Sequence, residues 1–204
     1  MKLLGYQWLL LIVILISMLA IALSKKIGLC WLNISQTMCF ILYFWLLFNL
    51  LVCFWELLII EYKDRLGIPK TNFYLKEYEL KDLLSPTFWI DGWNQYLKVD
   101  PRYANPNSSV FRYELFNVLV SFIPSIYVIY HLVSPNAILK QNELFNVFVF
   151  YSILQLSGAS FYFASYFKKY GTQYIGLKYK EETIYLFLSL LWILIPLYLI
   201  TNAF

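Results

Sequence analysis

The chain has 204 residues, of which 61% are hydrophobic, 21% aromatic and only 14% charged, and its mean hydropathy is +0.62. This composition is far more apolar than that of a soluble domain, and it indicates an integral membrane protein. The net charge of +4 does not indicate a nucleic-acid partner, because 13 of the 16 Lys and Arg residues fall at Lys2 and in the ranges 61–112 and 168–182.

Five apolar stretches are long enough to cross a membrane: 7–24, 38–60, 113–134, 144–167 and 183–203. A membrane-spanning helix needs about 20 mostly apolar residues. The stretches are continuously apolar rather than alternating, which excludes the strands of a transmembrane barrel. The sequence therefore predicts an all-α, polytopic bundle of five transmembrane helices.

The first apolar stretch has two interpretations. Lys2 precedes an apolar core and Ala20-Ile21-Ala22 resembles a signal-peptide cleavage site, but the run is long for a signal core, which favours an uncleaved helix. We divide the chain into this first helix with its flank, 1–27, and a four-helix domain, 28–204, with an extramembrane loop at 61–112.

The basic residues predict the orientation. The positive-inside rule places the N-terminus and the ranges 61–112 and 168–182 in the cytoplasm, and the C-terminus across the membrane. Within the long loop we expect a short amphipathic helix from Lys76 to Leu84. We also expect an aromatic segment from Pro86 to Trp93 at the membrane interface.

Polar side chains inside the apolar stretches are costly in hydrocarbon and normally face the bundle interior. Helical spacing puts them on one face of each helix: Asn49, Cys53 and Glu56 on the second, Glu114, Asn117 and Ser121 on the third, Ser152, Gln155 and Tyr162 on the fourth, and Ser189 and Trp192 on the fifth. We expect the second to fifth helices to surround a polar-lined pocket, with the first helix outside it.

The same residues could also have purely structural roles. Small polar groups join helices through hydrogen bonds alone. Glu56 and Glu114 lie near helix ends and could reach the headgroups. Glu114 could instead interact favourably with the dipole of a helix that begins beside it.

Several kinds of site are not indicated. The sequence has no Walker loop, dinucleotide glycine fingerprint, HExxH motif or GxSxG elbow, so we expect no cofactor and no metal. Cys30, Cys39 and Cys53 show no CxxC spacing and are expected to be free thiols. His131, the only histidine, is expected to be interfacial rather than catalytic.

One stretch carries a resemblance. It reads Trp93-x2-Tyr96-x3-Asp100-x-Arg102-Tyr103-x10-Glu114, with Gln155-x2-Gly158-x3-Tyr162-Phe163 and Trp192-x3-Pro196 further along. This pattern resembles the emopamil-binding, sterol Δ8-Δ7 isomerase branch of the EXPERA family over roughly residues 28–200. The resemblance implies a five-helix protein of the endoplasmic reticulum membrane that moves a sterol double bond.

The resemblance also implies roles. In that family a carboxylate at the position of Glu114, and a His and a Glu on the second helix, transfer the protons. Here Glu56 matches the family Glu after a one-residue shift, and Val52 or Leu51 stands where the family has His. Independently of the family resemblance, a carboxyl group in surroundings without water keeps its proton at neutral pH and could protonate an alkene.

Three hypotheses follow. The first is an isomerase of a sterol or sterol-like lipid, with Glu114 and Glu56 as the catalytic pair. Its substrate-binding residues would be Asn49, Trp55, Asn117, Ser121, Gln155, Tyr162, Ser189 and Trp192, whose aromatic members could stabilise a carbocation. The second, which the missing His favours, is a non-catalytic EXPERA protein that binds sterols or cationic amphiphiles in lipid trafficking or quality control. The third is a purely structural membrane subunit; a homodimer is left open for all three.

Overall fold

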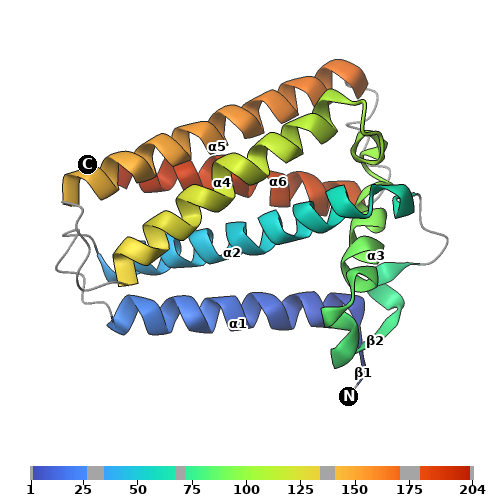
Figure 1. Cartoon of the computed structure of the whole chain (residues 1–204), viewed down its shortest axis with the longest axis horizontal. Coiled ribbons are helices and arrows are strands. Elements are labelled where there is room, and N and C mark those ends of the chain that lie inside the picture. The colour runs from blue at the N-terminus through green and yellow to red at the C-terminus, as the bar shows by residue number, and fades with distance from the viewer. Residues whose placement is uncertain (1, 27–34, 68–71, 134–140, 171–179, 203–204) are drawn as a thin grey trace.

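The computed structural model describes residues 2–26, 35–67, 72–133, 141–170 and 180–202. The described helices are α1 (Gly5–Lys26), α2 (Gln36–Glu61), α3 (Pro86–Tyr96), α4 (Ser109–Val133), α5 (Gln141–Tyr170) and α6 (Lys180–Asn202), and the strands are β1 (Lys2–Leu4) and β2 (Glu77–Glu79). The long helices run along the molecule, and α3 lies across one end of them (Figure 1). The fold is predominantly helical, as predicted.

Four of these helices, α1, α2, α4 and α5, are long and apolar enough to cross a membrane. The chain is therefore a multi-pass membrane protein. In α6 the described apolar part is Ser189–Asn202, which is shorter than a span. The side chains of the first part of α6 lie outside the described residues, so the predicted count of five spans is not confirmed.

Helix α2 is the centre of the bundle and packs against α1, α3, α4 and α6. Its residues Trp45 and Leu46 are fully buried in a cluster that includes Val128 of α4 and Tyr151 of α5. Helix α1 lies on the outer side of α2, where its Ala20 packs on Tyr43. Because lipid is as apolar as these side chains, close van der Waals packing holds the helices together.

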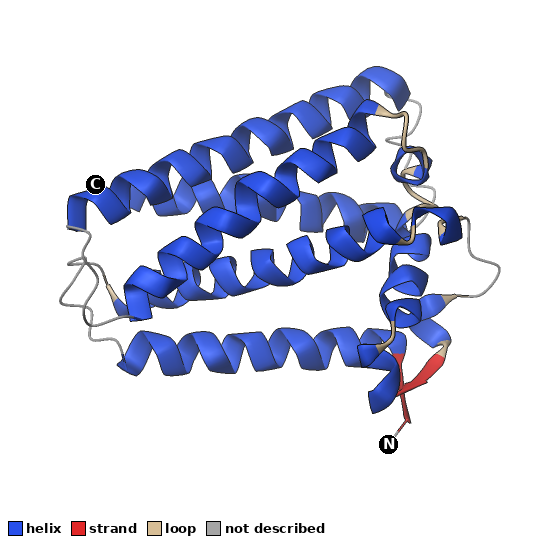
Figure 2. Cartoon of the chain, viewed as in Figure 1, coloured by secondary structure: helices blue, strands red, loops and turns tan. Residues whose placement is uncertain are grey.

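The strands lie at the N-terminal end of the bundle (Figure 2). Strand β1 pairs antiparallel with β2, so that Leu3 is opposite Tyr78. The indole N–H of Trp8 donates to the Tyr78 carbonyl at 2.9 Å. The prediction of a helix from Lys76 to Leu84 is wrong. The backbone of β2 pairs with β1 instead, and only Leu80–Leu84 form a 3₁₀ helix.

Helix α3 contains the whole of the predicted aromatic segment. Pro86 occupies its first turn, and the Ser85 hydroxyl accepts from the Thr87 N–H at 3.3 Å, which caps it. Phe88 and Trp89 are buried. The aromatic side chains of α3 therefore fasten this helix to the end of α2.

Helix α4 begins at Ser109 rather than at 113. The Ser108 hydroxyl accepts from the Phe111 N–H at 3.0 Å and caps the earlier start. Glu114 consequently lies in the second turn, where the helix dipole has little effect. The dipole is therefore a poor explanation for Glu114.

Candidate functional site

Two carboxyl groups meet inside the bundle. Glu56 of α2 and Glu114 of α4 lie close enough for their carboxyl groups to interact directly. Glu56 is 4% exposed, whereas Glu114 is half-buried. Ionised carboxylates can only accept hydrogen bonds, so a hydrogen bond between the two groups would need a proton on one of them. Burial of Glu56 between helices argues against its reaching the headgroups.

Neutral donors surround the pair. The Asn117 amide donates to Glu56 Oε1 at 3.4 Å, and the Ser121 hydroxyl donates to Asn117 Oδ1 at 3.0 Å. The Tyr103 hydroxyl is hydrogen-bonded to Glu114. Glu56 Oε2 has no hydrogen-bond partner among the described residues. The pair is thus supported from α4 and from the loop before it.

The hydrogen bonds continue into α5 and back to α2. Ser121 is hydrogen-bonded to the Tyr151 hydroxyl. The Gln155 amide donates to that hydroxyl at 2.8 Å and to Asn49 Oδ1 at 2.6 Å. The Trp45 indole donates to Gln155 Oε1 at 2.8 Å. Since an indole can only donate, this last contact fixes the orientation of the Gln155 amide.

This polar chain joins the predicted residues Asn49, Asn117, Ser121 and Gln155 to the carboxyl pair. Its links come from α2, α4 and α5 (Figure 1). The sequence did not single out Trp45 or Tyr151. Each lies one helical turn before a predicted residue, four positions before Asn49 and Gln155, so helical spacing could have found both.

A buried ion pair stands beside the carboxyl pair. Asp100 is fully buried, and Arg102 Nη2 approaches its Oδ2 at 2.6 Å. The Tyr162 hydroxyl donates to the same oxygen at 3.0 Å. Arg102 also donates to the Ser165 hydroxyl at 3.1 Å and lies over the ring of Tyr166, with 5.6 Å to its centroid. These contacts attach the 3₁₀ helix Pro101–Ala104 to α5.

Aromatic rings connect the ion pair to Glu114. The rings of Trp93 and Tyr96 are 4.9 Å apart, and both pack against Tyr103, at 5.4 and 5.2 Å. Tyr103 follows Arg102 in the chain and bonds to Glu114. The first part of the resemblance pattern, from Trp93 to Glu114, is thus packed together at the end of the bundle.

Other predicted site residues lie elsewhere. The Trp55 indole donates to the Trp89 carbonyl at 2.6 Å and faces α3. Trp192 packs on Trp45 at 5.3 Å. Trp45 lies about 16 Å along α2 from Glu56 at 1.5 Å per residue.

Ser189, Tyr162 and the cysteines complete the set of predicted polar residues. Ser189 is half-buried on α6. The Tyr162 hydroxyl bonds to Asp100. Cys39 and Cys53 are buried free thiols, as predicted, and Cys30 lies outside the described residues. Within the described ranges no cluster of His, Cys, Asp and Glu could hold a metal ion.

Comparison with known proteins finds two plant relatives. The chain is 28% identical over 155 residues to protoglabretal synthase of Citrus sinensis, which covers 76% of this chain and 68% of that protein. It is 29% identical over 149 residues to isomeliandiol synthase of Ailanthus altissima, covering 72% of this chain and 65% of that protein. The chain thus spans about two thirds of the length of either relative. No protein-family model and no solved structure matches it.

Proposed function

We propose that the chain is an intramembrane isomerase that moves a carbon–carbon double bond in a sterol or sterol-like isoprenoid lipid. The close approach of the Glu56 and Glu114 carboxyl groups inside the bundle carries the proposal. The similarity to two proteins named as synthases supports an enzyme that forms a product over a protein that only binds. The EXPERA resemblance adds the sterol Δ8-Δ7 class and a place in the endoplasmic reticulum membrane.

The chemistry needs one proton added and one removed. The protonated member of the pair gives its proton to one alkene carbon, which leaves a carbocation on the other. Loss of a proton from a neighbouring carbon to the carboxylate forms the new double bond, so atoms and charge balance without an outside reactant. A carboxyl pair that shares one proton contains both the acid and the base.

The surroundings suit an apolar guest. Glu114 is half-buried, and its neighbours Leu115 and Phe116 are exposed on the surface that faces lipid. The faces of Tyr103 and Trp93 near Glu114 could stabilise a developing cation. In this proposal a lipid ring system reaches the pair from the bilayer, and Asn117 with Ser121 keeps Glu56 oriented.

The test is turnover in membranes. Membranes with the full chain receive a Δ8-sterol, and gas chromatography with mass spectrometry measures the Δ7 product. Glu114→Gln and Glu56→Gln should each lower the rate at least about a hundredfold, because general acid–base catalysis contributes that much or more. Glu61→Gln, an exposed acid on the same helix, is the matched control and should keep the wild-type rate. Wild-type turnover in both glutamine variants would disprove the role of the pair.

A second candidate function rests on Val52 and Leu51, one of which stands where the resembled family has its His. Without that His, the carboxyl pair could serve a non-catalytic protein that binds sterols or cationic amphiphiles. Saturable binding of a tertiary-amine amphiphile that Glu56→Gln abolishes, together with no Δ7 product from wild type, would favour this function. Product formation by wild type would exclude it.

A further inference from the structure

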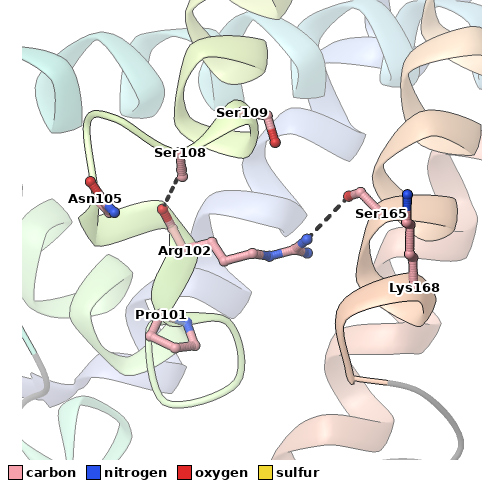
Figure 3. A pocket seen from close by; sticks show the side chains of 7 residues that line it. All are labelled: Pro101, Arg102, Asn105, Ser108, Ser109, Ser165 and Lys168. Carbon is pink, nitrogen blue, oxygen red and sulfur yellow. Dashed lines mark hydrogen bonds between the residues drawn. The ribbon is translucent and has the colours of Figure 1, made fainter.

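A polar hollow of about 670 Å³ lies at the end of the bundle, apart from the carboxyl pair. It forms where the 3₁₀ helix Pro101–Ala104, the first turn of α4 and the last turns of α5 come together. Figure 3 shows Arg102 reaching across it to Ser165, with Ser108 and Ser109 beside α4 and Lys168 on α5. Hollows of this size commonly hold small molecules.

The chemistry of its walls favours an anion. The lining residues are Pro101, Arg102, Asn105, Ser108, Ser109, Ser165 and Lys168, which include two cations and no carboxylate. The carboxylate that balances Arg102 belongs to Asp100, which is fully buried behind it. Lys168 is exposed, and because no carboxylate lines the hollow beside it, it gives the hollow a net positive charge. The first turn of α4 also borders the hollow, and a helix N-terminus favours negative charge.

An apolar surface continues from the hollow toward the bilayer. On α5, Phe161 lies one turn before Ser165 on the same face; on α4, Tyr113 lies one turn after Ser109. The rings of Tyr113 and Phe161 are 5.4 Å apart, and Phe161 is 47% exposed. Phe116 extends this surface and is 52% exposed. A hydrophobic tail can therefore lie directly beneath an anionic head.

We propose that this hollow binds the phosphate of an anionic phospholipid, whose acyl chains lie along Phe116, Tyr113 and Phe161. The hollow lies at the end of the membrane helices, where headgroups are found. The Lys168 ammonium and the Ser109 hydroxyl match the charge and the acceptor oxygens of a phosphate. The hydroxyls of Ser108 and Ser165 already donate to the carbonyls of Arg102 and Tyr162. Free phosphate offers the same charge and oxygens as the headgroup, but it has no acyl chain to lie on the aromatic surface. The aromatic surface therefore favours the lipid over free phosphate. The site is independent of the proposed isomerase activity.

Native mass spectrometry of the detergent-purified full chain tests the proposal, with phosphatidic acid and phosphatidylcholine as probes. Wild type should retain phosphatidic acid in preference to phosphatidylcholine. Lys168→Gln should weaken phosphatidic acid binding about fivefold, the effect of one lysine charge at an anionic headgroup, and Lys168→Arg should restore it. Phe161→Ala should weaken it as well.

Lys63→Gln is the matched control, since Lys63 is an exposed lysine at the same end of the bundle that does not line the hollow. It should leave binding unchanged. Equal losses in Lys63→Gln and Lys168→Gln would indicate only diffuse surface charge and would overturn the proposal. Inorganic phosphate that displaces phosphatidic acid at equal concentration would assign the hollow to a free anion instead. Equal thermal unfolding temperatures of the variants and wild type show that a loss of binding does not result from misfolding.

Discussion

At the scale of single residues, the charged groups near the site are neutralised within the protein. Asp100 accepts from Arg102 and Tyr162, and Glu56 pairs with Glu114. Removing charges from water is costly unless each is paired and hydrogen-bonded. The two pairs differ in what they leave available. The ion pair is closed by its partners, whereas Glu56 Oε2 has no hydrogen-bond partner among the described residues.

The ion pair gives the first prediction. Asp100→Asn should destabilise the protein by about 3–5 kcal/mol, because the buried Arg102 loses its counter-charge. The double variant Asp100→Asn/Arg102→Met should recover part of this loss. Lys76→Gln, which breaks the more exposed pair with Asp91, should cost less than about 1 kcal/mol. Denaturant unfolding in detergent measures all three, and equal losses for the two single variants would contradict a structural role for the buried pair.

A pH dependence follows from Tyr78 in β2, outside the membrane helices. Burial, the hydrogen bond to Asp91 and the charge of that carboxylate raise the pKa of Tyr78 above the ordinary 10.0. The folded protein therefore keeps a proton that the unfolded chain releases. Stability from this group is complete below about pH 10, the ordinary tyrosine pKa, and is lost as the pH rises above it.

Unfolding free energies measured from about pH 8 to 11, across the ordinary pKa of tyrosine, check this sign. Wild type should lose stability more steeply at the alkaline end than Tyr78→Phe. Lys76 pairs with Asp91 in wild type and in Tyr78→Phe, so the charge of Lys76 affects both stability curves equally. Parallel curves for the two proteins would show that Tyr78 contributes nothing to the alkaline loss.

At the scale of elements, close approach of α4 and α5 depends on one glycine. A Cβ at Gly158 would overlap the Tyr113 hydroxyl and lie 2.6 Å from the ring carbon Cζ. The Tyr113 ring packs on Phe161 of the same helix as Gly158. Gly158 thus admits an aromatic side chain of the neighbouring helix.

Gly158→Ala should destabilise the protein by about 1–3 kcal/mol through overpacking. In the double variant Gly158→Ala/Tyr113→Ala the losses should be clearly less than additive, because the clash is gone. Gly67→Ala, where a Cβ meets nothing within 4 Å, is the control and should change stability little. Thermal unfolding in detergent measures the cycle; additive losses would mean that Tyr113 and Gly158 do not interact.

The elements also show what sequence reasoning could reach. The membrane helices were predictable, because a backbone in lipid must satisfy its own hydrogen bonds and long apolar runs have no other way to do so. The polar faces followed from helical spacing. The pairing of β1 with β2 could not be predicted in this way, because the two strands are far apart in the chain. Which neighbour Trp55 or Trp192 meets depends on the rotation of whole helices, which no local pattern contains.

At the scale of the whole molecule, the site and the hollow share one end. The N-terminus, the end of α2, α3, the start of α4 and the end of α5 lie at this end, and the C-terminus lies at the other (Figure 1). Glu56 and Glu114 both lie within about two turns of it, given 3.6 residues per turn. The arrangement agrees with the distribution of basic residues, which predicts that this end faces the cytoplasm.

Cysteine labelling in sealed microsomes tests that orientation. In a chain whose three native cysteines are replaced by alanine, Lys98→Cys should react with a membrane-impermeant maleimide added outside the microsomes, because the outside is the cytoplasmic face. Asn202→Cys, at the end of α6, should react only after the membrane is permeabilised. Lys98 and Asn202 are both exposed, so a difference reports the side of the membrane and not burial. The opposite pattern would put the carboxyl pair and the polar hollow near the lumenal leaflet. A phosphatidic acid probe would then have to be offered from that leaflet to reach Lys168.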